Sequence, residues 1–267
     1  MEHAIVTSHH SIQLSVLDGT FTRNGRRETL SGREHAFLAL LAISSRPRSV
    51  CELGEIMWPD REDEAARNCA KVYAHRVRMR LGRPDAVLRA FTGYILGGCV
   101  EVDTRCIEAT LARARVARAI DPSLRSAIDD ALTRLGAATA AAARGFHEIE
   151  RYLARLATEL AMLAFDDARR GGDHRRALSA ALRLVDFDPC DEMGHELAIL
   201  AHLGRGDDVS AARTYRDHVR VLRHELDTEP SERLRSLLAR SGQYAGQAPP
   251  NSVTRYARAW QRTTGGE

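Results

Sequence analysis

The sequence predicts a mainly α-helical protein, in which a winged helix-turn-helix with small β-sheets precedes an all-α domain of tetratricopeptide-like helical repeats. Three observations predict this fold. Strand and hairpin patterns are confined to the chain before Val102. A basic amphipathic helix lies between two of these hairpin patterns. In the helical half, a Gly-Asp pattern recurs after 34 residues, which is the period of tetratricopeptide helix pairs.

Length and composition allow two domains. The chain has 267 residues, 44% of them hydrophobic, which is enough for one large core or two ordinary cores. The longest apolar run, residues 36–43, is too short to cross a bilayer, and the first ten residues lack the apolar core of a signal peptide. We therefore expect a cytoplasmic, nucleoid-associated protein that makes no contact with a membrane.

The cysteines argue against disulfides and against metal. There are five of them, an odd number, and no two form a CxxC pair. We expect reduced, mostly buried thiols, no structural zinc site and no cofactor. The segment His147-Glu148-Ile149-Glu150-Arg151 begins like a metalloprotease helix but has Arg where the second His ligand would stand.

The N-terminal region predicts a small sheet followed by two helices. Residues 12–17 alternate apolar and polar side chains, and Asn24-Gly25 is a strong signal for a tight hairpin. Ser31 with Glu34 forms a capping-box pattern before residues 36–43. Ser49 with Glu52 repeats the pattern before a short helix that Pro59 ends.

The third helix, expected over residues 66–82, has two different faces. Four apolar residues at helical spacing predict its inner stripe, namely Ala70, Ala74, Val77 and Leu81. Five others are expected to point outward, namely Asn68, Val72, His75, Arg76 and Met79. We expect Lys71 and Arg78 on one flank of the helix and Tyr73 and Arg80 on the other.

Charge is segregated along this helix. Asp60, Glu62, Asp63 and Glu64 gather at its N-terminal end, where they suit the helix dipole and can cap free N–H groups. The segment from Arg67 to Arg89 contains seven Arg or Lys residues and one acidic residue, so its local charge is +6, whereas the formal charge of the whole chain is +3. One interpretation of this charge is an ordinary solvent-exposed helix in an arginine-rich protein, and the other is a helix that binds nucleic acid. Apolar Val72 and Met79 among the outward cations favour a helix that lies in the major groove of DNA, where they can meet thymine methyl groups.

A second hairpin follows the basic helix. Gly82 and Pro84 end the helix, and residues 87–91 and 94–98 flank Thr92-Gly93 as a turn. Sheet, three helices and hairpin are the element order of a winged helix-turn-helix, in which the third helix enters the groove and the wing touches the neighbouring backbone. We place this domain at residues 1–103.

The remaining chain predicts helices only. Apolar stripes run through Ile149, Tyr152, Leu156, Leu160 and Leu163, and through Ala211, Tyr215, Val219, Leu222 and Leu226. Gly172-Asp173 with Ala177 recurs as Gly206-Asp207 with Ala211. A repeat domain is therefore expected over residues 104–241. Residues 242–267 are rich in Gly, Gln, Pro and Thr, and we expect a disordered tail.

With these pieces in place, the chain resembles the Streptomyces antibiotic regulatory protein family, which joins an OmpR-like winged helix to a bacterial transcriptional activator domain. In the first half the resemblance rests on four segments, SGREHAFLALLA, SVCELGEIMWPD, ARNCAKVYAHRVRMRLG and TGYIL. In the second half it rests on AARTYRDHVRVLRHELDTEPSERLRSLL. It covers roughly residues 12–240.

The resemblance implies an activator of transcription that is not an enzyme. It implies binding to promoter direct repeats in double-stranded DNA, as a homodimer, with contacts to RNA polymerase. The residues expected at the DNA are, on the helix, Asn68, Lys71, Val72, Tyr73, His75, Arg76, Arg78 and Arg80, and, on the wing, Arg89, Thr92 and Tyr94.

Two regions depart from the family pattern. In the wing, where the family tends to have Arg-Gly-x-Gly-Tyr, this chain has Ala90-Phe91-Thr92-Gly93-Tyr94, with Arg89 one residue away from the usual place. Asp227 stands where the family often has Gly, and Asp tolerates turn geometry.

Two other classes of function remain open. One is an interaction scaffold, whose repeats bind a protein or peptide while the basic domain adds nonspecific affinity for nucleic acid. The other is an enzyme without a recognisable motif. The chain has no P-loop, GxGxxG or GxSxG motif, and no catalytic residue is predicted.

Overall fold

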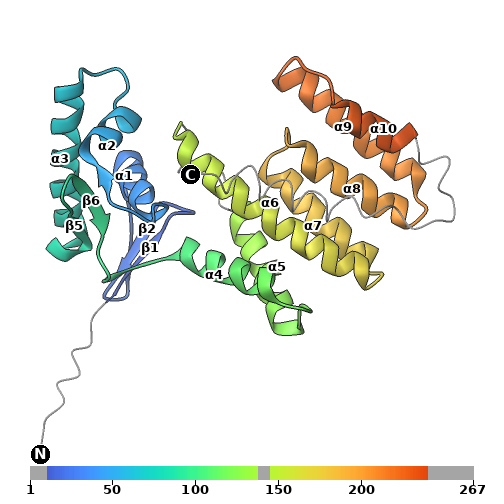
Figure 1. Cartoon of the computed structure of the whole chain (residues 1–267), viewed down its shortest axis with the longest axis horizontal. Coiled ribbons are helices and arrows are strands. Elements are labelled where there is room, and N and C mark those ends of the chain that lie inside the picture. Colours follow the sequence, from blue (N-terminus) through green and yellow to red (C-terminus); the bar gives the residue numbers. More distant parts are fainter. Residues whose placement is uncertain (1–10, 138–144, 240–267) are drawn as a thin grey trace, which may run out of the picture. The chain divides into compact units, whose positions relative to one another are not determined.

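The computed structural model describes residues 11–137 and 145–239 (Figure 1). The predicted tail, residues 242–267, lies outside them. The chain divides into two compact units, Met1–Ala109 with Ala137–Leu153, and Thr110–Gly136 with Ala154–Glu267. Small sheets occur in the first unit and the second is helical, which confirms the predicted fold class.

A four-stranded sheet opens the first unit. Its order is β3-β2-β1-β7, formed by β1 (Ile12–Ser15), β2 (Thr20–Arg23), β3 (Arg26–Thr29) and β7 (Val100–Val102). Asn24 and Gly25 have φ of 51° and 73° between β2 and β3, the left-handed conformation that a tight hairpin requires. The predicted Asn-Gly hairpin is thus confirmed. The parallel pairing of β1 with β7 was not predicted.

Two helices follow, each with the predicted cap. They are α1 (Gly32–Ala42) and, after the short strand β4 (Arg48–Ser49), α2 (Val50–Met57). Ser31 and Ser49 each accept from the backbone of the Glu three residues later, whose side chain bonds back. Helix α1 is almost entirely buried and forms the centre of the core of this unit.

The basic helix and the wing complete the first unit. They comprise α3 (Asp63–Leu81), the short 3-10 helix η1 (Pro84–Ala86), β5 (Val87–Arg89) and β6 (Gly93–Leu96). The wing sheet has the order β4-β6-β5. Gly82, with φ of 64°, ends α3 in the left-handed conformation.

The turn of the wing differs from the prediction by one residue. Ala90 and Gly93 exchange backbone hydrogen bonds of 2.9 and 3.2 Å, so Phe91 and Thr92, not Thr92 and Gly93, are the central residues of the turn. Gly93 is needed in β6 instead. A Cβ there would lie 1.7 Å from the carbonyl oxygen of Arg48 on the adjacent strand β4.

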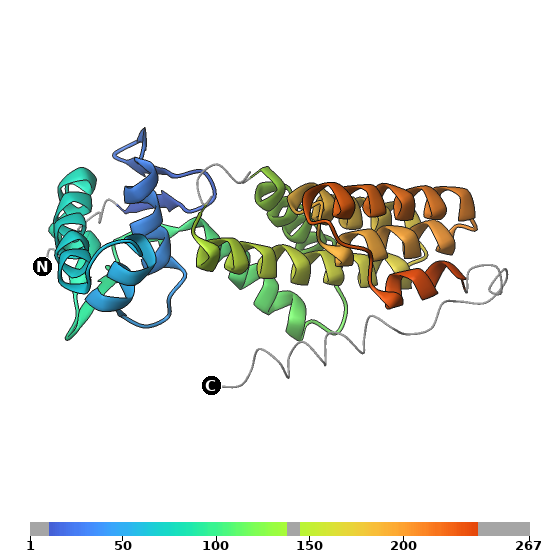
Figure 2. The same ribbon diagram turned by 90° about the horizontal axis from the view of Figure 1, so that it is seen from above.

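Seven helices form the remainder of the described chain. These are α4 (Asp103–Val116), α5 (Pro122–Ala137), α6 (His147–Arg170), α7 (His174–Phe187), α8 (Glu192–Gly204), α9 (Asp208–Glu225) and α10 (Glu232–Ala239). Within the second unit, α7 packs on α8 and α8 on α9, and the three helices lie side by side in Figure 2. None of the described helices has both the length and the apolar character needed to cross a membrane.

The repeat predicted from the sequence corresponds to equivalent turns in the structure. Gly172 and Gly206 have φ of 71° and 70°. Asp173 and Asp207 cap α7 and α9 by accepting from the backbone N–H three residues on. Ala177, like its counterpart Ala211, is fully buried.

Two expectations about burial are wrong. Leu226, the last residue of the predicted α9 stripe, is 55% exposed and stands at the C-cap, one residue beyond the end of α9. The thiols are not mostly buried either. All five cysteines are exposed or half-exposed, and Cys51 and Cys106 are exposed because they lie on the solvent-facing sides of α2 and α4.

Candidate nucleic-acid interface

Helix α3 has the two faces that its sequence predicts. The inner stripe is fully buried, comprising Ala70, Ala74, Val77 and Leu81. The outer residues are all exposed, namely Asn68, Val72, His75, Arg76 and Met79. Val72 is 62% exposed and Met79 69% exposed, so two hydrophobic side chains stand in solvent among cations.

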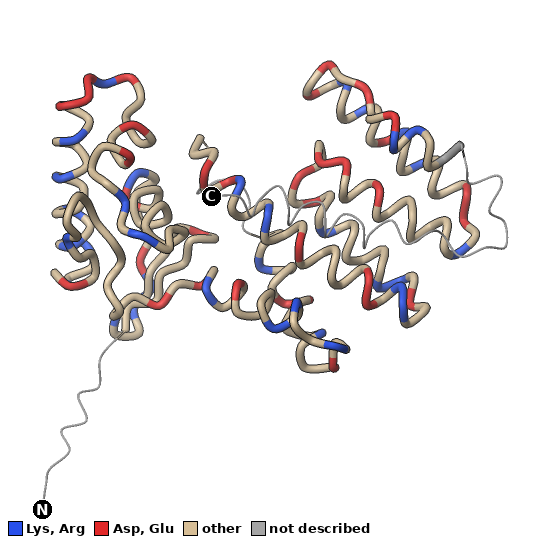
Figure 3. The backbone as a smooth tube through the Cα atoms, viewed as in Figure 1, with Lys and Arg blue, Asp and Glu red and all other residues tan. Residues whose placement is uncertain are grey.

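Charge along α3 is arranged as expected. Asp63 and Glu64 lie in its first turn, and the rest of the helix contains no acid. Figure 3 shows acidic residues gathered at the N-terminal end of α3 and basic residues along its length. One detail differs, since Glu62 stands at the N-cap position but its side chain makes no capping hydrogen bond. Its contribution there is limited to the helix dipole.

Arg76 is oriented by a carboxylate from another helix. Its Nε donates to Glu34 Oε1 at 2.9 Å. Glu34 also accepts from the backbone N–H of Ser31 at 3.0 Å, as part of the α1 capping box. Burial acts to raise the pKa of Glu34, but the hydrogen bonds from Ser31 and Arg76 hold it below its usual value. The Glu34 side chain is 7% exposed and that of Arg76 58% exposed. The guanidinium is therefore anchored at Nε while much of it faces solvent.

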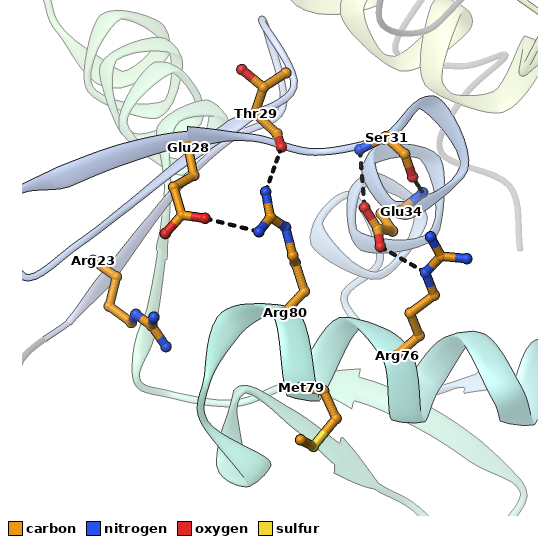
Figure 4. A pocket seen from close by; sticks show the side chains of 8 residues that line it. All are labelled: Arg23, Glu28, Thr29, Ser31, Glu34, Arg76, Met79 and Arg80. Atoms are coloured by element: carbon orange, nitrogen blue, oxygen red, sulfur yellow. Dashed lines mark hydrogen bonds and ion pairs between the residues drawn. The ribbon is translucent and has the colours of Figure 1, made fainter.

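Arg80 is anchored on the sheet side of α3. It donates to the Thr29 carbonyl oxygen at 3.1 Å and pairs with Glu28 at 2.9 Å. Figure 4 shows Arg76 turned toward Glu34, and Arg80 turned toward Glu28 and Thr29. Beside them lies a hollow of about 720 Å³. Residues of β2, β3, α1 with its N-cap, and α3 line the hollow, namely Arg23, Glu28, Thr29, Ser31, Glu34, Arg76, Met79 and Arg80.

Arg78 points the other way and ties α3 to the wing. Its Nε donates to the Val87 carbonyl oxygen of β5 at 2.7 Å. Its guanidinium carbon also lies 5.4 Å from the centre of the Tyr94 ring of β6, within the range of a cation–π contact. The wing is therefore fixed against the helix, and Figure 1 shows the two alongside each other.

The remaining predicted residues of α3 are at or near its surface. Lys71 Nζ donates to Asn68 Oδ1 at 3.3 Å, and both side chains are exposed. Tyr73 is half-buried, with its ring centroid 5.2 Å from that of Trp58 and the Arg76 guanidinium carbon 5.6 Å above it. The structure thus brings the eight predicted α3 residues onto one exposed side or its two flanks.

The three predicted wing residues differ in exposure. Arg89 and Thr92 are exposed. Tyr94 is buried, and its ring lies between Phe37 of α1, at 6.3 Å, and the Arg78 guanidinium. Tyr94 can therefore support the wing, whereas Arg89 and Thr92 can meet a partner.

Three residues at this site were not among the predicted site residues. Glu34 was recognised only as a capping residue, because its contact with Arg76 spans 42 positions. Met79 was predicted to face outward but was not assigned a contact. Phe91 enters the sequence prediction only as part of a departure from the wing pattern, and its full exposure is seen only in the structure.

Comparison with solved structures shows the fold. The structure of Mycobacterium tuberculosis EmbR in complex with a low affinity phosphopeptide is similar, with a TM-score of 0.55 and 19% sequence identity. The match covers 94% of this chain and 69% of EmbR. A search of the curated proteins returned no match.

Comparison with family models decides the family. The bacterial transcriptional activator domain matches residues 102–240. The chain belongs to this family. Together with the EmbR-like fold, the match confirms the resemblance to the Streptomyces antibiotic regulatory proteins. The chain is a transcriptional activator of that type, whose N-terminal winged-helix domain carries α3 and the wing.

Proposed function

We propose that this activator binds promoter repeats in double-stranded DNA sequence-specifically and recruits RNA polymerase. One observation carries the proposal, the outer face of α3. This face combines exposed cations with exposed Val72 and Met79 and has no acid beyond the first turn. Phosphates attract such a face, and base edges offer partners to both kinds of side chain.

The anchoring of the arginines supports a division of roles. Glu34 holds Arg76 at Nε, which lowers the entropy lost when the exposed guanidinium nitrogens bind a guanine edge in two places. Lys71 and Arg78 lie on the flank of the helix, where the phosphate backbone passes a helix seated in the major groove. Val72 and Met79 supply apolar atoms for thymine methyl groups.

The partners follow from the family and from symmetry. Direct repeats in a promoter offer two equivalent sites, so we expect two copies of the chain to bind one operator. The repeat helices provide extended faces once their core is filled, and we assign to these faces the contacts with the second copy and with RNA polymerase. No enzymatic step is part of this function.

Titration of the full chain against DNA tests the proposal. A duplex selected by the chain from a random pool is compared with a scrambled duplex of equal length and composition, at several salt concentrations. We expect the selected duplex to bind about 10³-fold more tightly or better. Equal binding to both would contradict the proposal and favour the alternative, a repeat scaffold with nonspecific nucleic-acid affinity.

A further inference from the structure

Phe91 is the most exposed large hydrophobic side chain in the described part of the chain, at 103% of its reference area. It is the first central residue of the turn that joins β5 to β6. Tight turns favour Gly, Asn, Asp, Pro and Ser for conformational reasons that Phe does not share. A side chain this exposed also adds nothing to the core. The fold therefore gives no reason for Phe at this position.

The backbone beneath Phe91 is held rigidly. Ala90 and Gly93 close the turn with two hydrogen bonds, and the Thr92 carbonyl oxygen accepts from the backbone N–H of Val50 at 3.1 Å. Gly93 packs so closely on β4 that a Cβ would collide with the Arg48 carbonyl oxygen. The aromatic ring is thus presented from a fixed point, which reduces the entropy lost on insertion into a partner.

The wing tip is coupled to the proposed DNA-reading helix. Arg78 of α3 bonds to β5 at 2.7 Å and covers the Tyr94 ring of β6. A helix seated in the major groove therefore carries this hairpin to the adjacent part of the duplex. Arg89, two residues before Phe91, is exposed and has the charge that the negative potential of a narrow minor groove attracts.

We propose that Phe91 inserts as a wedge between base pairs from the minor groove beside the α3 site and kinks the DNA there. The inference rests on the proposed DNA binding. Apolar side chains at the tips of minor-groove-binding elements unstack base steps in this way, most easily at flexible pyrimidine–purine steps. A protein partner fits the tip less well. A specific protein interface buries about 1,000 Å² or more, but the apolar surface at the tip is confined to Phe91, because its neighbours Thr92 and Arg89 are polar.

The test uses the full chain and the duplex that it selects from a random pool. One duplex carries end-labels for energy transfer, which reports bending. A series carries 2-aminopurine at successive purines, which brightens on unstacking. The variants are Phe91→Ala and Phe91→Leu, with Leu88→Ala as the matched control, because Leu88 is a half-exposed hydrophobic residue of the same hairpin.

We expect Phe91→Ala to bind the selected duplex about tenfold more weakly, as loss of one base-stacking contact predicts, and a scrambled duplex as tightly as before. It should also lose both the bend and the 2-aminopurine signal. Phe91→Leu keeps an apolar wedge and should retain most of the bend, and Leu88→Ala should match the unaltered chain.

Three results would overturn the inference. If Phe91→Ala bends and unstacks the duplex as the unaltered chain does, the wedge is wrong while DNA binding stands. If it binds and bends normally but no longer activates a reporter, Phe91 belongs to a protein interface. If the unaltered chain selects no duplex at all, both the proposed function and the insertion of Phe91 are wrong.

Discussion

Three arginines at alternate positions of α3 contact three different parts of the winged-helix unit. Arg76 bonds to α1 and Arg80 to β3, whereas Arg78 bonds to β5 of the wing. The helical period explains this division, because residues four apart point the same way while residues two apart diverge by about 200°. The side chains that we propose contact DNA therefore also hold α3 in place.

Arg76 and Arg78 should differ in their effects on DNA binding. If Arg76 contacts a guanine edge, Arg76→Ala costs about 1 to 3 kcal/mol on the selected duplex and much less on a scrambled duplex. If Arg78 contacts a phosphate, Arg78→Ala weakens both complexes alike and lowers the salt-dependence slope by about 1. Lys71→Ala should resemble Arg78→Ala. Titrations of the three variants at several salt concentrations measure these effects.

The matched control for Arg76 is Glu34→Gln, which keeps a hydrogen-bond acceptor for Nε but removes the charge. We expect it to lower selectivity less than Arg76→Ala does. Equal weakening of both duplexes by Arg76→Ala would show that α3 does not read bases in the proposed orientation.

A buried histidine pair should make the repeat domain sensitive to acid. The rings of His195 and His218 lie against each other at a tilt of 31°, with centroids 4.0 Å apart, and His218 is fully buried. Burial, reinforced by the neighbouring His195, lowers the pKa of His218 from 6.5 to about 4. Burial also lowers the pKa of His195. Both rings are therefore neutral in the folded chain at neutral pH.

The unfolded chain binds protons at a higher pH than the folded chain, so stability present above pH 6.5 is lost as the pH falls toward 4. For His218 alone the loss is about 3 kcal/mol at most. Denaturant titrations at pH 7.5 and pH 5 measure it. His218→Leu should flatten this pH dependence, and His224→Leu, which alters an exposed histidine, should not. If the free energy of unfolding falls as steeply with pH in His218→Leu as in the unaltered chain, His218 is not the source of the acid sensitivity.

At the scale of elements, the two repeat turns should be equivalent in energy. Asp173 caps α7 as Asp207 caps α9, after glycines of nearly identical φ. Asp173→Ala should lower the free energy of unfolding by about 1 kcal/mol, and Asp207→Ala should destabilise in the same sense. Asp208→Ala, one residue beyond the cap, is the control. Denaturant titration measures these effects. If only one of the two cap variants lowered the free energy of unfolding, the two repeat turns would not be equivalent.

The elements that the sequence predicts best are those defined by neighbours along the chain. The Asn24-Gly25 hairpin, the Ser31 and Ser49 caps and the buried stripe of α3 all depend on residues within a few positions of one another. Their local geometry follows from dihedral preference and helical period.

The features that were missed depend on distant residues. Strand β7 pairs with β1 although most of the sequence of the first unit lies between them. Asp103 accepts a hydrogen bond of 2.6 Å from Ser15 Oγ, and these two residues are 88 positions apart. The Arg76–Glu34 bond spans 42 positions. No periodicity encodes such pairs. The candidate site could be predicted as one face of α3, but not which of its arginines are anchored or that Phe91 occupies the turn.

At the scale of the whole molecule, binding and activation should be separable. We expect a fragment of residues 1–103 to retain selective DNA binding and to lose activation of a reporter, because it lacks the repeat faces that we propose contact RNA polymerase. The fragment also lacks Glu148, which pairs with Arg48 within the first unit at 3.0 Å. A thermal melt must therefore first show that it folds. Full activation by a folded fragment would contradict the assignment.

The central claim is that α3 selects the sites at which this activator works. A genome-wide map of bound sites in cells that contain the full chain tests it most directly, with Arg76→Ala at equal abundance beside it. We predict discrete sites upstream of genes that share a directly repeated motif, and loss of those sites in the variant. A signal spread evenly over the genome, or sharp sites that Arg76→Ala leaves unchanged, would contradict the claim.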